Sequence, residues 1–181
     1  MQDAGPVWRS LLFVPVNVDK FVETAHTRGA DAIILDLEDS VPLGEKAAAR
    51  DLVPAAAERV SRSGADVVVR LNRPWRLAGR HIEASVGPGV TALSLPKIAD
   101  AGHVRAIAEI VDEIEHEKGL APGHTRLIAM VETADAFFHM REIAGAHPRL
   151  IAMTLGGEDF ALSADMQPIP EALFYPSQQM I

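Results

Sequence analysis

The sequence contains no cysteine, and this absence excludes several kinds of chemistry at once. It rules out disulfides, thiolate-bound metals and a cysteine nucleophile. A chain without disulfides agrees with a reducing compartment. The N-terminus MQDAGPVWRS also lacks the basic-then-apolar order of a signal peptide. We therefore expect a cytoplasmic protein.

A long basic run and a long apolar segment are also missing. The formal net charge is −8 at pH 7, which argues against binding to a nucleic-acid backbone. Each apolar stretch is interrupted by charge before it reaches membrane-spanning length. We expect neither nucleic acid nor a membrane as a partner. An anionic substrate would then need locally placed cations, for which Arg70 and Lys97 are the candidates.

What the sequence does contain is a series of short apolar runs that end in charged or polar residues. Such runs are typical of parallel strands covered on both faces, and the C-terminal ends of these strands form a shared rim where active sites are built. The predicted rim holds Glu38, Arg70, Lys97, Glu132 and Asp159. The runs are AIILDLED (32–39), VVVRLN (67–72), ALSLPK (92–97), LIAMVET (127–133) and LIAMTLGGED (150–159).

Helical stretches alternate with these runs, which is the order of repeated βα units. With 181 residues, 48% of them hydrophobic, the chain has enough material for one core, so we expect a single domain over residues 1–181. A closed eight-stranded barrel needs about 250 residues. An open doubly wound sheet is the alternative, but no G-x-G-x-x-G follows the first strand. We predict an α/β fold of the TIM (β/α)8 type, truncated after about six βα units, with strands seven and eight missing.

Two connections are less regular than the others. Residues 45–64 are rich in helix formers, but Pro54 should kink or divide that helix. Residues 73–89 contain two prolines and three glycines, so we expect an irregular connection with one short helix.

Glu132 and Asp159 end the adjacent fifth and sixth strands, so their carboxylates can approach one another. A divalent cation would explain the pair, because Mg²⁺ takes one or two protein carboxylates and completes its shell with water and substrate oxygens. Gly156 and Gly157 would let the backbone come close to a ligand. The alternative is that both acids are solvated loop residues or helix N-caps. We favour the magnesium site.

Arg70 and Lys97, the two cations of the predicted rim, could each bind substrate or have a purely structural role. Arg70 suits a substrate carboxylate in bidentate geometry, or it forms a buried ion pair with Asp36 or Glu38. Lys97 either contacts a phosphate or carboxylate or lies at the surface.

Asp36, Glu38 and Asp39 form an acidic cluster. Their carboxylates would repel one another unless nearby cations neutralise them. Lys46 and Arg50, one helical turn apart, are well placed to do so. The cluster then braces the loop after the second strand, or one of its members reaches metal-bound water.

The motifs LLFVPVN, ILDLEDSV with EKAAAR, VVRLN, LPK, ETADAF and LGGEDFA occur in an order that resembles the citrate lyase β-subunit-like branch of the HpcH/HpaI aldolase superfamily. The resemblance implies a Mg²⁺-dependent (β/α)8 barrel that acts on acyl-CoA thioesters, commonly as a trimer or hexamer. It implies that Glu132 and Asp159 bind the metal and that Arg70 binds the substrate carboxylate. With the rim, it gives Arg70, Glu132 and Glu38 as catalytic residues and Arg70, Glu132, Lys97 and Asn72 as substrate-binding residues.

The implied reaction is reversible carbon–carbon cleavage of a 3-hydroxyacyl-CoA such as citryl-, malyl- or citramalyl-CoA. Its products are an oxo acid or an acetate-derived partner and an acyl-CoA. One alternative is a class II aldolase that acts on free oxo acids, although such relatives favour a histidine where this chain has DLED. The other is a non-catalytic partner subunit of a multi-component lyase.

Overall fold

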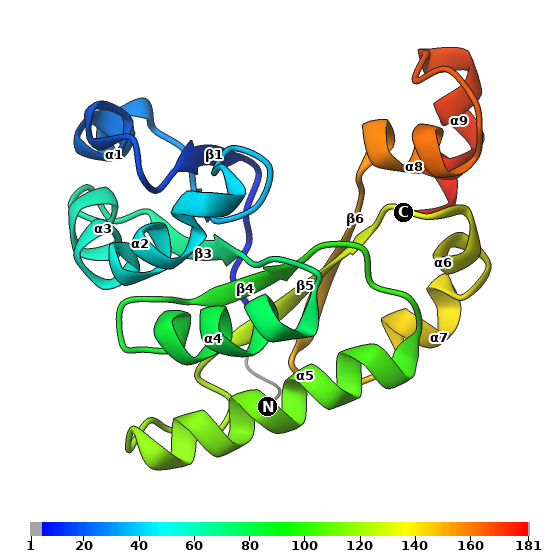
Figure 1. The fold of residues 1–181 in the computed structure, drawn as a ribbon. Helices are drawn as coiled ribbons and strands as arrows, with labels where there is room; N and C mark the ends of the chain where they lie inside the picture. Colours follow the sequence, from blue (N-terminus) through cyan, green and yellow to red (C-terminus); the bar gives the residue numbers. More distant parts are fainter. Residues whose placement is uncertain (1–4, 181) are drawn as a thin grey trace.

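A single parallel β-sheet of six strands forms the centre of the protein, as a computed structural model of residues 5–180 shows (Figure 1). The strands lie in the sheet in the order of the sequence, and each neighbouring pair is parallel. The prediction of an α/β fold with six parallel strands is confirmed. The strands are β1 (Leu11–Pro15), β2 (Ala32–Asp36), β3 (Asp66–Arg70), β4 (Ala92–Leu95), β5 (Arg126–Val131) and β6 (Leu150–Leu155).

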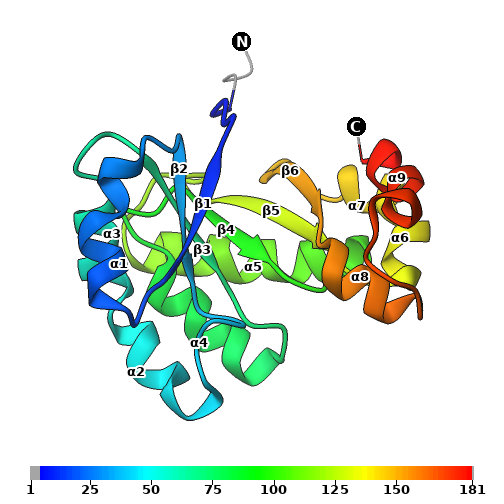
Figure 2. The same ribbon diagram turned by 90° about the horizontal axis from the view of Figure 1, so that it is seen from above.

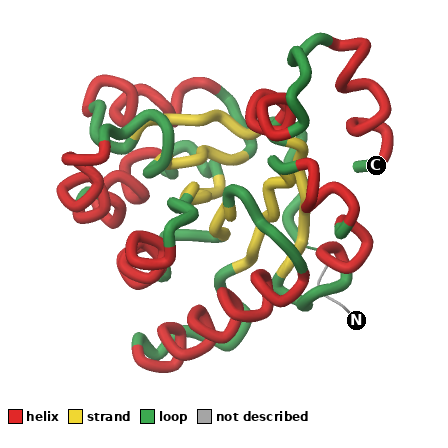
Figure 3. The backbone as a smooth tube through the Cα atoms, turned by 45° about the vertical axis from the view of Figure 1, so that its right-hand side comes forward, coloured by secondary structure: helices red, strands yellow, loops and turns green. Residues whose placement is uncertain are grey.

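Helices connect successive strands and return the chain to the start of the next strand, as parallel pairing requires (Figure 3). Within residues 5–180, no helix is long and apolar enough to cross a membrane. The α-helices are α1 (Asp19–Ala25), α2 (Lys46–Asp51), α3 (Val53–Val60), α4 (Trp75–Ser85), α5 (Ala101–Glu117), α6 (Ala134–Phe138), α7 (Met140–Ala144), α8 (Gly157–Ser163) and α9 (Pro170–Gln179), with 3-10 turns η1 (His26–Arg28) and η2 (Leu43–Glu45).

Of the predictions for the two irregular connections, one is confirmed and the other is wrong. Pro54 does divide its helix, since α2 ends before it and Pro54 occupies the first turn of α3. The prediction for residues 73–89 was wrong in length, because α4 is a regular helix of 11 residues. Pro74 lies at its N-cap and not inside it, and Gly79 is tolerated because Ala78 and Ile82 bury one side of the helix.

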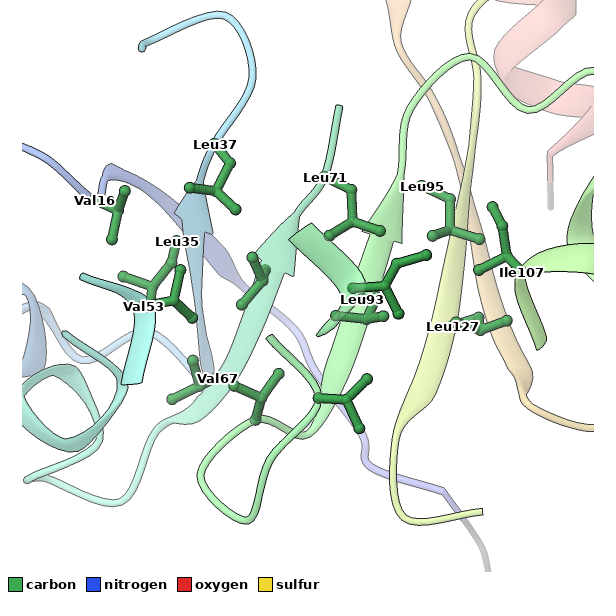
Figure 4. Close-up of a cluster of buried hydrophobic side chains, with 14 of the residues drawn as sticks. Val16, Leu35, Leu37, Val53, Val67, Leu71, Leu93, Leu95, Ile107 and Leu127 are labelled. Carbon is green, nitrogen blue, oxygen red and sulfur yellow. The ribbon is translucent and has the colours of Figure 1, made fainter. Parts of the chain in front are cut away.

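Alternate residues of each strand face opposite sides of the sheet. One set, which includes Leu35, Leu93 and Leu127, packs against the helices in the main core (Figure 4). The other set, which includes Ile34 and Val68, forms a smaller cluster on the opposite side. Burial on both sides explains why the strands read as continuous apolar runs.

The side of the sheet away from the helices is open between β1 and β6. These two strands are the edges of the sheet (Figure 2), and within residues 5–180 they do not pair with each other. A cavity of about 560 Å³ lies there, and Phe13 on β1 remains 48% exposed beside it. In a complete barrel such side chains fill the interior. Closure by a seventh and eighth strand stays a prediction.

A buried ionic cluster joins the amino ends of β5 and β6 to α5. Arg149, 4% exposed, donates from Nη1 to Glu115 Oε1 at 2.9 Å and to the carbonyl of Thr125 at 2.8 Å. The Glu115 carboxylate, 1% exposed, also accepts from the backbone N–H groups of Thr125 at 2.6 Å and Gly123 at 2.9 Å. Its burial is therefore fully compensated, which stabilises the end of the fold opposite the rim.

Replacing Arg149 by methionine should lower the free energy of unfolding by about 3–5 kcal/mol, because it leaves the Glu115 carboxylate buried without its cation. Urea denaturation measures the change. Arg9→Met is the control, since it removes an ion pair with Asp31 in which the Arg9 side chain is 83% exposed, and it should leave the midpoint unchanged. Equal midpoints for Arg149→Met and wild type would contradict this account.

Candidate active site

The carboxyl ends of β2 to β6 bring the predicted rim residues together. The register places Asp36 beside Arg70 and Arg70 beside Ser94, so neighbouring strands end at the same level. Polar contacts then run from one strand end to the next. In order they link Asp36, Arg70, Glu38, Lys97 and Asp159, with Glu132 joined through the backbone of Lys97.

Arg70 forms the buried ion pair that was one of its two predicted alternatives. Its Nε donates to Asp36 Oδ1 at 2.7 Å and its Nη2 to Asp36 Oδ2 at 2.8 Å. Nη1 donates to Asp39 Oδ2 at 3.1 Å and lies 3.1 Å from Glu38 Oε2. Burial raises the pKa of Asp36, but the hydrogen bonds from Arg70 and Ser40 outweigh it, so the net pKa is lowered. Asp36 therefore stays ionised.

Lys97 links the acids of three strand ends. Its ammonium lies 2.7 Å from Asp159 Oδ2 and 3.2 Å from Glu38 Oε1, while its backbone N–H donates to Glu132 Oε2 at 2.6 Å. The residue has a φ of +50°, in the left-handed region that non-glycine residues seldom adopt. Arg73 Nε donates to its carbonyl at 3.1 Å. Contacts on every polar group of Lys97 hold it in this unusual conformation.

Glu132 is deeply buried, with 2% of its surface exposed. Burial is the main reason that its pKa rises to about 7, and the carboxylates of Glu38 and Asp159 raise it further. The backbone N–H of Lys97 opposes this rise without cancelling it. The alternative that Glu132 is a solvated loop residue is therefore wrong.

Gly156 makes room for Glu132. A Cβ added to Gly156 would lie 2.6 Å from Glu132 Oε1 and would also overlap the side-chain carbons. Its neighbour Gly157 has only a flexible leucine side chain, Leu173, at 3.1 Å from such a Cβ. The first of the two predicted glycines is thus required by a close approach, although to a side chain and not to a ligand.

Two carboxylates, Glu132 and Asp159, form the candidate metal site. The part of the chain that the structure describes has no group of three or more histidine and acidic residues arranged around one point. A pair is sufficient for Mg²⁺, because the ion usually keeps several waters and accepts substrate oxygens. A carboxylate such as Glu132, whose pKa is raised by burial and further by like charges, would be stabilised by a cation beside it. The residues present therefore fit a magnesium ion.

Two residues behind the rim, Lys46 and Arg50, differ from their predicted contacts, and Asn72 contacts the backbone. Lys46 was expected to pair with the acidic cluster, but its ammonium donates to backbone carbonyls after β2. Arg50 does not reach the cluster and contacts Asp51 at 3.3 Å. Asn72, predicted to bind substrate, is buried and donates to the carbonyl of Leu37. Its role toward substrate stays a prediction.

Sequence reasoning missed two residues that support the rim. His81, on α4, is fully buried and its Nδ1 lies 3.2 Å from Asn72 Nδ2. Arg73 holds the carbonyl of Lys97. If residues 73–89 had been predicted as a regular helix, His81 would have fallen on its buried side together with Ala78 and Ile82.

The geometry agrees with comparisons to known proteins. The profile described as HpcH/HpaI aldolase/citrate lyase matches residues 9–172. The chain belongs to this family. The citrate lyase subunit beta of Escherichia coli K12 is 36% identical over 166 residues, which cover 90% of this chain and 54% of that protein. The (3S)-malyl-CoA thioesterase of Cereibacter sphaeroides is 34% identical over 108 residues, 59% of this chain and 38% of that protein.

A solved structure of the family gives the same result. The citrate lyase beta subunit of Mycobacterium tuberculosis, complexed with oxaloacetate and magnesium, superposes with a TM-score of 0.64 at 30% identity. The match covers 87% of this chain and 61% of that structure. The chain thus spans about half the length of the citrate lyase relative from Escherichia coli.

The raised pKa of Glu132 should make stability depend on pH. The folded state favours the protonated acid, so this stabilisation is complete below the ordinary pKa of 4.5 and is lost as the pH rises through about 7. Relative to Glu132→Gln, wild type should lose about 2 kcal/mol between pH 5 and pH 8 in urea denaturation with EDTA present. The exposed neighbour of the site, Glu158→Gln, is the control and should show no such trend. A pH-independent difference for Glu132→Gln would contradict the assignment.

Proposed function

We propose that this chain carries the active site of a Mg²⁺-dependent carbon–carbon lyase that cleaves or forms a 3-hydroxyacyl-CoA, such as citryl-, malyl- or citramalyl-CoA. The products of cleavage would be a small oxo acid or acetate-derived partner and an acyl-CoA. The observation that carries the proposal is the buried Glu132 beside Asp159, at the ends of adjacent strands and in contact with Lys97. Magnesium and oxaloacetate in the related structure support it.

Glu132 and Asp159 would hold the magnesium ion. When bound, the ion would act as a Lewis acid toward the oxo group of the acid. Glu132 must be deprotonated to serve as a ligand, so its pKa of about 7 predicts tighter metal binding as the pH rises. Lys97 neutralises Asp159 at 2.7 Å and would have to release that carboxylate for it to bind the ion.

Arg70 would hold the carboxylate of the oxo acid. A guanidinium has five N–H donors. Three of them point to Asp36 and Asp39, and Nη1 also lies 3.1 Å from Glu38 Oε2, so the second N–H of Nη2 is the donor that would bind the substrate. Because Asp36 fixes the guanidinium on two sides, this donor is oriented before substrate arrives, and this lowers the entropy lost on binding.

Glu38 lies between the two cations, with one carboxylate oxygen facing each of them. Burial raises its pKa, which suits a group that exchanges a proton with substrate or water. We assign it the acid–base role and assign Lys97 a contact to the substrate.

Thioester hydrolysis is a second candidate, because malyl-CoA thioesterases are among the relatives. The same rim would bind the acyl group, and water would attack the thioester carbonyl. A class II aldolase acting on free oxo acids and a non-catalytic subunit are the remaining alternatives.

Turnover assays with citryl-, malyl- and citramalyl-CoA and Mg²⁺ should separate these functions. Release of an oxo acid together with an acyl-CoA supports the lyase. Release of free CoA without carbon–carbon cleavage supports the thioesterase, and cleavage of free acids alone supports the aldolase. Asp159→Asn should lower turnover by at least about 100-fold, since it removes a metal-binding carboxylate. Asp165→Asn, an exposed acid after α8, should not. An inactive wild type would contradict catalysis by this chain.

Gly156→Ala should weaken Mg²⁺ binding by about 10-fold or more, because the new methyl group displaces the Glu132 carboxylate. Isothermal titration calorimetry measures the affinity. Gly44→Ala is the control, since a Cβ there meets no atom within 4 Å. Equal affinities of Gly156→Ala and wild type would show that Glu132 does not bind the ion.

A further inference from the structure

The loop that follows β2 carries Glu38 into the rim, and a buried ammonium holds this loop from behind. Lys46, the first residue of α2, is only 7% exposed. Its Nζ donates to the carbonyl of Leu37 at 2.7 Å and to the carbonyl of Glu38 itself. A hydrogen bond from a charged donor is about twice as strong as a neutral one. Two consecutive peptide groups are thereby fixed in orientation.

A second donor reaches the same loop from β3. Asn72 follows that strand by two residues, and its Nδ2 donates to the carbonyl of Leu37 as well. Asn72 is in turn placed by His81 of α4, whose Nδ1 lies 3.2 Å from Nδ2. Burial lowers the pKa of His81 to about 4, so the ring is neutral and Nδ1 can accept a hydrogen bond.

The Lys46 ammonium does not form an ordinary salt bridge. No carboxylate of the described residues lies within ion-pair distance of Lys46 Nζ, although Asp36, Glu38 and Asp39 act on it at longer range. Burial lowers the pKa of Lys46, so the buried charge is a real cost. The buried ammonium fixes the orientation of the backbone from which the Glu38 side chain extends.

We propose that Lys46 is a positioning residue, assisted by Asn72, which holds the backbone of Leu37 and Glu38 so that the Glu38 carboxylate meets Arg70 and Lys97. This role rests on the proposed function in one respect, namely that Glu38 takes part in the reaction. Lys46 itself does not touch the substrate. It acts from the far side of the loop, through the peptide groups.

Lys118, an exposed residue where Lys46 is buried, offers a control for the contacts to backbone carbonyls. Its ammonium also donates to two backbone carbonyls, Val86 at 2.8 Å and Glu83, at the end of α4. It lies at the far end of that helix from the rim. Lys46→Met and Lys118→Met therefore remove the same kind of interaction from two places, and only the first supports Glu38.

Two readouts test the proposal. The first is steady-state kinetics with the acyl-CoA that wild type prefers. Lys46→Met should lower kcat by about 10- to 100-fold, the loss expected from displaced catalytic geometry, with KM changed less than about twofold. Lys118→Met should leave both values unchanged. The second is the ¹H–¹⁵N resonance of Arg70 Nε, assigned by its disappearance in Arg70→Lys, which should shift in Lys46→Met and not in Lys118→Met.

If Lys46→Met folds poorly, Asn72→Leu removes the second donor to Leu37 without removing a charge. It should shift the same resonance and lower kcat by a smaller factor. The Arg70 signal decides the question even if wild type proves inactive, in which case the proposed function fails separately. An unchanged Arg70 resonance, or a kcat for Lys46→Met equal to that of Lys118→Met, would overturn the positioning role.

Discussion

The pairing of two cations, Arg70 and Lys97, with a ring of carboxylates is the interaction on which the rest of the site depends. Parallel strands in register deliver these acids to one level, where they would repel each other in a partly buried space. Arg70 neutralises the acids at the end of β2, and Lys97 links Glu38 to the acids after β5 and β6. Glu132 receives only a backbone N–H from this network, and its pKa is raised to about 7. It is the acid beside which an added cation would gain most.

The two ends of the sheet solve the same electrostatic problem in different ways. At the amino ends of β5 and β6, Arg149 and backbone N–H groups satisfy Glu115 completely, so that carboxylate is a fixed part of the fold. At the carboxyl ends the compensation is incomplete, because Glu132 accepts only a backbone N–H and its pKa is raised. In (β/α)8 barrels the amino ends of the strands serve stability and the carboxyl ends carry the active site.

The strands and the rim could be predicted from the sequence, because strands buried on both faces leave continuous apolar runs whose last residues share one edge. The gathering of Glu132, Asp159 and Lys97 at one rim follows from that topology. The ion pair of Arg70 with Asp36 could not be predicted with certainty, since it depends on how the side chains at the ends of β2 and β3 are oriented. The length of α4 was missed because a proline inside a helix breaks it, whereas Pro74 lies at the N-cap of α4, where a helix can begin. Lys46 was predicted to pair with carboxylates, but it donates to backbone carbonyls. A pattern of charges in a sequence does not show which backbone carbonyls accept hydrogen bonds.

The central claim is that Glu132 and Asp159 form a magnesium site that takes an oxo acid. The most direct test is isothermal titration of Mg²⁺, with oxaloacetate present, into wild type and Glu132→Ala. The account predicts that wild type binds metal and oxo acid together and that the variant binds neither at the same concentrations. Equal binding by both proteins, or no binding by wild type, would contradict it.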